Sequence, residues 1–251
     1  MANPVLRETT FTRERNIVES STGTMTVGGT ATKTLILLLL LIAGAAYTWN
    51  YYYNAINPAS VNKWLWIGLI GGLVTALIIS FKPKMAQYLS PIYAVAEGLM
   101  IGAFSAIINE QFAATYPNIV IHAVSLTFVT ALVMFTVYRS GIIKVNGTFM
   151  KIMTIAMISI LVFYIGSWIL SMFGLNLTMV HNNSLLSIGI SAVIVAVAAF
   201  SLLIDYDFII KASEQGAPKY MEWYGAFGLV VTLVWLYLEI LKLLAKVSSR
   251  D

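Results

Sequence analysis

Long hydrophobic runs, separated by short polar stretches, occupy most of the chain. Each run is roughly 17 to 25 residues long, the length that an α-helix needs to cross a bilayer. Seven such runs occur, at residues 34–53, 64–81, 89–108, 118–138, 149–173, 185–210 and 221–244. Turn-forming residues such as Asn57-Pro58 and Gly216-Ala217-Pro218 lie between the runs. The pattern predicts an all-α integral membrane protein with seven transmembrane helices in a single bundle.

The runs divide the chain into three parts. Residues 1–33 form a polar arm that lacks the apolar core and cleavage site of a signal peptide. Residues 34–244 form the seven-helix transmembrane domain, whose short loops leave no room for a second domain. Residues 245–251 form a short polar tail. We therefore expect one helical domain with a solvated cytoplasmic arm at its amino terminus.

The composition agrees with a membrane protein. Hydrophobic residues make up 59% of the 251 residues and charged residues only 10%, whereas about a quarter of the residues in an ordinary soluble domain are charged. A soluble enzyme, a disordered chain and a nucleic-acid binder are therefore excluded as leading interpretations. The absence of cysteine excludes disulfides and thiolate metal sites. No residue pattern marks an enzyme, and no cofactor is expected.

Lys and Arg are distributed unevenly between the two sides of the predicted bundle. The side that holds the amino-terminal arm carries eleven of them and the other side four. The four are Lys63, Lys242, Lys246 and Arg250. Because basic residues concentrate in cytoplasmic loops, the count predicts a cytoplasmic amino terminus. With seven spans, the carboxyl terminus is then predicted outside.

Acidic residues inside the apolar runs are the candidate functional residues. A charged group in hydrocarbon costs several kcal/mol unless it is paired, protonated or hydrated, and no Lys or Arg lies at the middle of a run. Such acids hold protons or coordinate a cation, which disfavours an anion pathway. We interpret the set as an ion pathway or pH sensor that binds cations only transiently. Its members are Asp205, Glu239, Glu97, Asp207 and Glu222.

The depth of each acid follows from the helical rise of about 1.5 Å per residue. Glu97 lies roughly 12 Å from the cytoplasmic start of its span, and Asp205 roughly 9 Å above Lys211. Glu222 enters the seventh span from the same side. We therefore predict a cytoplasmic cluster of Glu97, Asp205 and Asp207, with Glu222 as a further candidate. Glu239 lies about 25 Å beyond Glu222 along a helix, near the outer face.

Three of these acids also have a plain structural interpretation. Asp207 can meet Lys211 at i+4. Glu222 can act as a helix-start acid that complements the helix dipole. Glu239 can form a surface salt bridge with Lys242 at i+3. These readings remain open beside the functional one, and Asp205 is the acid that we favour to face the bundle axis.

Glycines recur at spacings that allow close helix contact. Small residues three or four positions apart let two helix backbones approach each other, so we interpret these glycines as packing seams. Gly98 directly follows Glu97, and a tight crossing there would hold the acid inside the bundle. The seams comprise Gly98 and Gly102, Gly68 with Gly71 and Gly72, and Gly225 with Gly228.

Three segments resemble the signatures of the Bax inhibitor-1 family, also called the transmembrane Bax inhibitor motif family. They are SPIYAVAEGLMIG at residues 90–102, IDYDFII at 204–210 and LYLEIL at 236–241. With seven spans and this length, the resemblance covers nearly all of residues 34–244. The chain looks like a bacterial member, which implies the bacterial inner (plasma) membrane.

The resemblance implies a fold in which the last helix is central and the other six surround it. It also implies a pH-sensitive calcium leak, in which an acid of the sixth helix and one of the seventh form a proton-sensing pair. By motif these are Asp205 and Glu239. They are 34 residues apart, and the depth estimate leaves Glu222 open as the partner of Asp205.

The leading function is therefore a calcium or cation leak channel or transporter with proton control. Because hydrocarbon favours the neutral form of a carboxyl group, we expect flux to depend on pH between roughly 5 and 8. The expected partners are the bilayer, Ca²⁺ and protons, with no nucleic acid.

Two other functions remain. A non-conducting regulatory protein would bind a membrane protease or stress-response partner, with Arg7, Arg13 and Arg15 in a docking arm. A proton-coupled transporter of small solutes would use the same acids.

Overall fold

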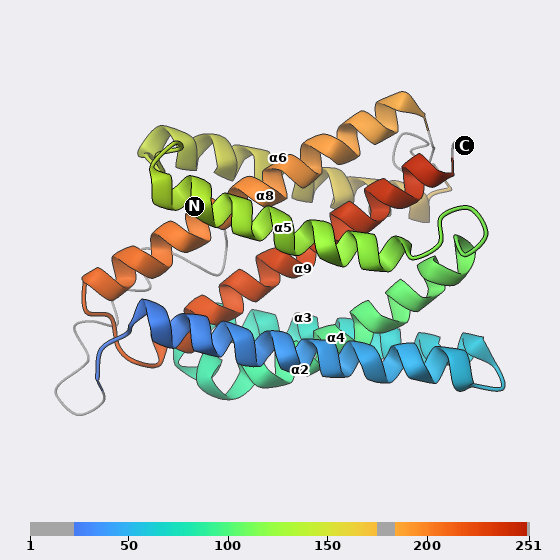
Figure 1. The fold of residues 1–251 in the computed structure, drawn as a ribbon, viewed down its shortest axis with the longest axis horizontal. Helices are drawn as coiled ribbons and strands as arrows, with labels where there is room; N and C mark the ends of the chain where they lie inside the picture. The colour runs from blue at the N-terminus through green and yellow to red at the C-terminus, as the bar shows by residue number, and fades with distance from the viewer. Residues whose placement is uncertain (1–22, 175–183, 250–251) are drawn as a thin grey trace. The chain divides into compact units, whose positions relative to one another are not determined.

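The computed structural model describes residues 23–174 and 184–249. Within them all regular structure is helical, apart from one isolated β-bridge between Thr24 and Pro218. Short 3₁₀ turns, η1 (Pro58–Val61) and η2 (Pro83–Met85), precede the second and third long helices. The long helices are α2 (Val27–Asn54), α3 (Asn62–Phe81), α4 (Ala86–Gln111), α5 (Ile119–Ser140), α6 (Gly147–Met172), α8 (Leu185–Glu214) and α9 (Met221–Ser248) (Figure 1).

Seven helices of the described residues are long and apolar enough to cross a membrane. The predicted fold class is confirmed. The predicted arm was too long, because α2 begins at Val27, and residues 27–33 are helical. The Thr26 side chain caps this helix by accepting a hydrogen bond from the Gly29 amide, as Thr commonly does at a helix start. The rest of the predicted arm, at residues 1–22, lies outside the described residues.

The chain divides into two compact units. The described part of the first, which we call the α2–α4 unit, comprises residues 23–111 and 205–231. The described part of the second, the α5–α6 unit, comprises residues 112–174, 184–204 and 232–249. Helices α8 and α9 therefore contribute residues to both units.

In the α2–α4 unit, helix α4 packs against both α2 and α3. On the α2 side, Gly98 meets the backbone of Leu41, and Gly102 meets Ala45 and the Thr48 hydroxyl. Any side chain at these two glycines would collide with α2, which is the contact that a packing seam requires.

Helix α3 approaches α4 through its own glycines. A Cβ atom at Gly68 would lie 2.6 Å from the Met100 amide nitrogen. One at Gly71 would make an ordinary contact of 3.5 Å with the Ala96 side chain. The close approach therefore depends on Gly68 and on Gly72, which faces the candidate site described below.

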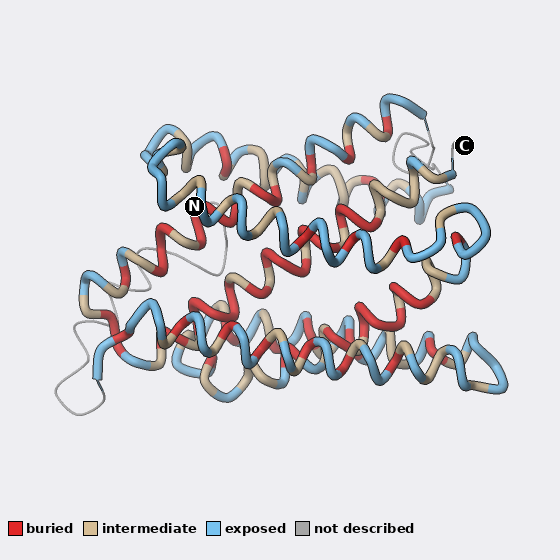
Figure 2. The backbone as a smooth tube through the Cα atoms, viewed as in Figure 1, coloured by how far each residue is buried: buried red, intermediate tan, exposed pale blue. Residues whose placement is uncertain are grey.

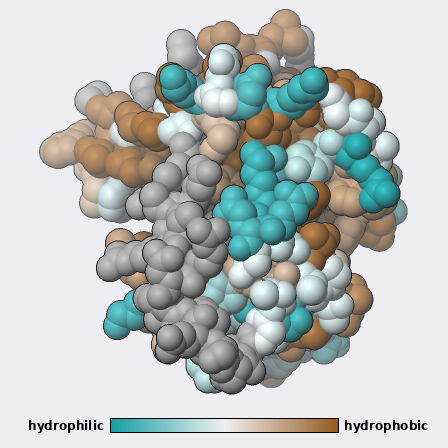
Figure 3. All heavy atoms as spheres, turned by 90° about the vertical axis from the view of Figure 1, so that its left-hand side faces the viewer, coloured by the Kyte–Doolittle hydropathy of each residue, from teal (hydrophilic) through white to brown (hydrophobic). Residues whose placement is uncertain are grey.

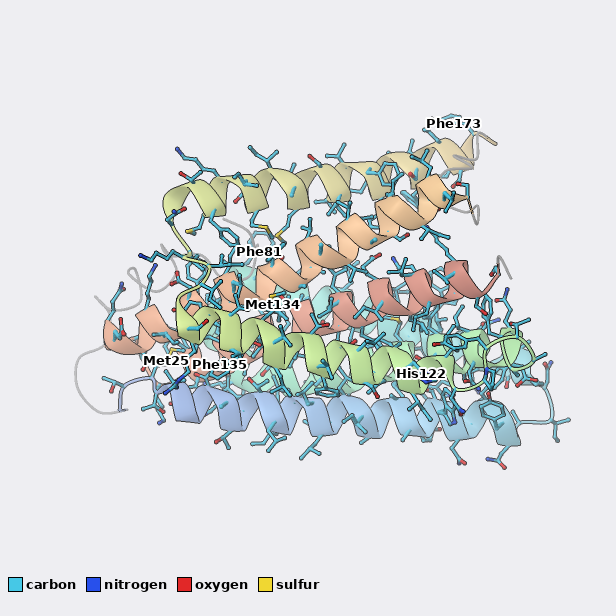
Figure 4. The ribbon with its side chains drawn as sticks, turned by 45° about the horizontal axis from the view of Figure 1, so that its top comes forward. Met25, Phe81, His122, Met134, Phe135 and Phe173 are labelled. Carbon is cyan, nitrogen blue, oxygen red and sulfur yellow. The ribbon has the colours of Figure 1, made fainter. Side chains whose placement is uncertain are left out.

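The α5–α6 unit is joined by aromatic and polar contacts. Phe149 of α6 packs edge-on against Phe200 of α8, with ring centroids 6.4 Å apart. His122, at the start of α5 (Figure 4), stacks on the Tyr116 ring at 5.3 Å. His122 is thus an aromatic packing residue at the helix end.

Burial differs strongly between the helices (Figure 2). Of the 18 most apolar consecutive residues of α6 only 6% are buried, whereas the share for α9 is 61%. Large apolar side chains such as Leu39, Ile70 and Leu161 are more than half exposed, as expected for surfaces that contact lipid. The high burial of α9 agrees with a central last helix, and that arrangement stays a prediction.

Candidate functional site

The five predicted acids are distributed over both units. Asp205 and Glu222 are 0% exposed, Glu239 2% and Asp207 7%, while Glu97 is half-buried. Glu97, Asp205, Asp207 and Glu222 belong to the α2–α4 unit and Glu239 to the α5–α6 unit. The pair that the motif implies, Asp205 and Glu239, therefore takes one residue from each unit and stays a prediction.

Glu97 points from α4 toward α3. A Cβ atom added at Gly72 would lie 2.5 Å from Glu97 Oε2, so the carboxylate fills the space that the glycine leaves. Gly98, its neighbour in the chain, faces α2 instead. The tight crossing at Gly98 thus anchors α4, while Gly72 on a different helix makes the room for the acid.

Asp205 and Asp207 lie about two turns before the end of α8 at Glu214. Every residue from 201 to 205 is buried, so Asp205 follows an apolar stretch that is shielded from solvent. Asp207 accepts from Lys211 Nζ at 2.7 Å, and the predicted i+4 contact is confirmed. Asp207 is thus neutralised by a local lysine at the helix end.

Glu222, in the first turn of α9, is held by groups from two parts of the chain. Its Oε1 atom accepts from the Thr26 amide at 3.0 Å, the Thr26 hydroxyl at 2.9 Å and Lys219 Nζ at 2.9 Å. Its Oε2 atom accepts from Lys33 Nζ. We call these four residues the Glu222 cluster. It meets the dipole expectation, since Glu222 lies in the first turn, and adds two ion pairs to it.

The Glu222 cluster ties the start of α2 to the α8–α9 turn. The Met25 amide donates to the Ala217 carbonyl at 2.7 Å, and the Ser213 hydroxyl donates to the Met25 carbonyl at 3.2 Å. Met25 lies at the amino-terminal end of α2 (Figure 4) and is 1% exposed. The contacts of Glu222 are therefore those of a structural tie, and its place in an ion pathway stays a prediction. Figure 3 shows hydrophilic side chains gathered on one face of the molecule.

Glu239 is held by three side chains. Lys242 Nζ lies 2.6 Å from Oε1, and the Trp235 indole N–H donates to the same oxygen at 3.2 Å. The Tyr164 hydroxyl, from α6, lies 3.1 Å from Oε1 and 3.0 Å from Oε2. We call these four residues the Glu239 cluster. The predicted pair with Lys242 is confirmed, but it is not a surface salt bridge, because the carboxylate is buried.

A second lysine lies one turn further along α9. Lys246 Nζ donates to the Ser187 hydroxyl at 3.0 Å and to the Ser191 hydroxyl at 2.8 Å, both on α8. Both serines are buried. The hydrogen bonds of Lys246 thus go to neutral hydroxyls, whereas those of Lys242 go to the Glu239 cluster.

Sequence reasoning missed several of these partners. The sequence places Lys33 in the solvated arm. In the structure Lys33 pairs with Glu222, which lies 189 positions further along the chain. Tyr164 is 75 positions from Glu239, and no local spacing points to it. Trp235 precedes Glu239 by four residues, and that spacing could have identified it.

Within the described ranges, no group of three or more His, Cys, Asp or Glu is placed to hold a metal ion. The glycines Gly225 and Gly228 lie in the buried start of α9. A Cβ atom at Gly225 would come within 3.3 Å of Ile209 and Thr30 side chains. The site therefore offers single carboxylates with tightly packed neighbours.

Comparison with known proteins gave one family match. The family model described as Bax inhibitor 1 like matches residues 3–249, nearly the whole chain. No curated protein matches the chain, and no solved structure does so either.

Proposed function

The chain belongs to the Bax inhibitor 1 like family of membrane proteins, and on that premise we propose that it is a pH-sensitive leak for cations, calcium above all. The family is linked to membrane transport and is not known for enzymatic activity. The observation that carries the proposal is the complete burial of Asp205 in a spanning helix. An ionisable residue at such a position is costly and is a functional residue by default.

Carboxylate chemistry explains both the ion and its control. Carboxylate oxygens are the ligands that Ca²⁺ takes in proteins, and protonation removes the charge that attracts the ion. A buried carboxyl group favours its neutral form more than a solvated one does. Flux is therefore proposed to change with pH between roughly 5 and 8, with Asp205 as the principal acid and Glu97 and Glu239 as further acids of the pathway.

The proposed location is the bacterial inner membrane, with the amino terminus in the cytoplasm. The membrane is proposed from the resemblance to a bacterial member of the family, and the orientation from the excess of Lys and Arg on the side of the amino terminus. Seven spans then place the carboxyl terminus on the outside. Labelling of single cysteines introduced near either end of this cysteine-free chain, with a reagent that does not cross membranes, tests this orientation.

Calcium uptake into liposomes tests the proposed function. The wild-type chain, Asp205→Asn and Glu110→Gln are reconstituted and compared from pH 5 to pH 8. Glu110 is an exposed acid at the end of α4, so Glu110→Gln removes the same charge outside the proposed pathway. We expect pH-dependent uptake by the wild type and by Glu110→Gln, and a changed pH profile for Asp205→Asn.

Two results would contradict the proposal. An Asp205→Asn profile equal to that of the wild type would exclude Asp205 as the principal acid. Folded wild-type protein with no uptake above protein-free liposomes would exclude the leak itself. It would favour a non-conducting protein that binds a membrane protease or stress-response partner.

A further inference from the structure

We propose that Lys242 is a tethered cation that occupies Glu239, and that a permeating cation reaches this carboxylate only by displacing it. The inference rests on the proposed function and adds to it a residue that sets the size of the leak. It concerns the Glu239 cluster alone, which lies within the α5–α6 unit.

The two members of the ion pair differ in exposure. The Glu239 side chain is 3% exposed and the Lys242 side chain 38%. Lys242 therefore reaches a buried carboxylate from a position that is partly open. Because the two residues are three apart on one helix, Lys242 can withdraw by side-chain rotation alone, and no helix needs to move.

The ammonium group of Lys242 also contacts Tyr164 while it is paired with Glu239. Lys242 Nζ lies 4.9 Å from the centroid of the Tyr164 ring and 3.3 Å from its hydroxyl oxygen. The face of an aromatic ring attracts a cation. Tyr164 therefore helps to hold Lys242 beside Glu239, and a displaced ammonium group turns away from both toward the open side of Lys242.

The two oxygens of Glu239 are used unequally. Oε1 lies within hydrogen-bonding distance of Lys242, Trp235 and Tyr164. Among the described residues, Oε2 lies within that distance of Tyr164 only. A carboxylate has about four lone-pair sites, so Oε2 keeps lone pairs that can bind an entering ion.

The Glu239 carboxylate itself favours divalent ions. At equal distance a carboxylate attracts a divalent cation twice as strongly as it attracts an ammonium group, because the Coulomb energy scales with the charge. A monovalent ion has no such advantage over Lys242. Every entering ion pays the same cost to displace the tethered lysine, so Lys242 lowers the occupancy of Glu239 by Ca²⁺ and by K⁺ alike, and the preference for Ca²⁺ comes from the carboxylate itself.

Calcium and potassium leak from liposomes tests the inference at one fixed pH. Lys242→Gln removes the tethered charge and keeps a polar side chain of similar length. We expect it to raise the calcium leak several-fold and to raise the potassium leak as well. Lys242→Arg keeps the charge, and its leak should rise less than that of Lys242→Gln.

Lys246→Gln is the matched control. It removes a lysine one turn along the same helix, whose hydrogen bonds go to Ser187 and Ser191. Lys246 acts on Glu239 only through space and not by direct contact, so the leak of Lys246→Gln should change far less than that of Lys242→Gln. Equal leaks for Lys242→Gln and the wild type, both shown to be folded by circular dichroism, would overturn the inference while the proposed function stands.

A binding measurement decides the case in which no variant leaks at all. That outcome contradicts the proposed function but leaves the occupancy of Glu239 to be measured. Equilibrium binding of calcium in detergent should then be tighter for Lys242→Gln than for the wild type, and the gain should disappear in the double variant with Glu239→Gln. Equal binding by all three proteins would overturn the inference as well.

Discussion

Glu222 and Glu239 lie on the same helix and are both buried beside a lysine three residues away, yet their other partners differ. Glu222 also accepts from the amide and hydroxyl of Thr26 and from Lys33. These groups belong to the start of α2, far away in sequence. Glu239 is held by side chains only, and its single lysine lies on its own helix. Glu239 also binds a distant residue, Tyr164, but only Glu222 is held from a distant segment by a charged group and a backbone amide. The charge of the distant partners therefore separates a tie between chain segments from an acid that can exchange its partner.

The physical difference is the cost of release. Releasing Glu222 would leave a backbone amide, a hydroxyl and two ammonium groups without their common acceptor, and the loss of a shared partner at a partly buried site is expensive. Releasing Glu239 from Lys242 leaves the acid bonded to Tyr164 and Trp235 and lets the lysine turn toward its more open side. We therefore expect the Glu222 cluster to govern stability and the Glu239 cluster to govern transport.

The largest expected effect is on stability, through loss of the charge of Glu222. Glu222→Gln should lower the free energy of unfolding by about 3 kcal/mol, because it leaves the largely buried Lys33 ammonium group without its anion and weakens the bonds from Thr26 and Lys219. Glu239→Gln should cost only about 1 kcal/mol, since the amide oxygen can still accept from Tyr164 and Trp235. Denaturant unfolding in mild detergent, followed by circular dichroism, measures both. Equal losses for the two variants would remove the distinction between the clusters.

A smaller loss should follow from a single methyl group at Gly29. A Cβ atom there would meet the Glu222 carboxyl group, including Oε2 at 2.5 Å. The carboxylate cannot easily yield, because four donor groups hold it. Gly29→Ala should therefore cost about 2 kcal/mol, as overpacking of a buried site does.

Gly28→Ala is the matched control for this change. Gly28 precedes Gly29 on the same helical turn, and a Cβ atom there would have nothing within 4 Å. Alanine favours helix over glycine by up to about 1 kcal/mol, so this variant should be at least as stable as the wild type. A loss of stability in Gly28→Ala equal to that in Gly29→Ala would assign the effect to the helix start and not to Glu222.

The sequence was sufficient for the features that depend on local patterns. Seven spans follow from the length of the apolar runs, and the pairs of Asp207 with Lys211 and Glu239 with Lys242 follow from helical spacing. The glycine spacing indicated a close contact at Gly98, although it did not identify α2 as the partner. These features involve residues within one helical turn or one run.

Features that join distant segments were out of reach. Lys33 follows Gly28, Gly29 and two threonines, so it resembled part of a solvated arm. Its helix begins seven residues earlier than predicted, because Thr26 caps it and Glu222 neutralises the lysine. Neither partner can be inferred from the run itself, since the pairing depends on how the α8–α9 turn folds back onto the start of α2.

The smallest expected effect concerns Tyr164 in the Glu239 cluster. Tyr164→Phe removes the hydroxyl that lies 3.0 Å from Oε2 and keeps the ring beneath Lys242. Stability should fall by about 1 kcal/mol, the net contribution of a typical intramolecular hydrogen bond. The calcium leak should fall as well, because Lys242 then bears a larger share of the charge of Glu239 and is harder to displace. Tyr88→Phe, at an exposed tyrosine of α4, is the control and should change neither the stability nor the leak. A leak from Tyr164→Phe above that of the wild type would show that the Tyr164 hydroxyl, and not Lys242, keeps the entering ion from Glu239.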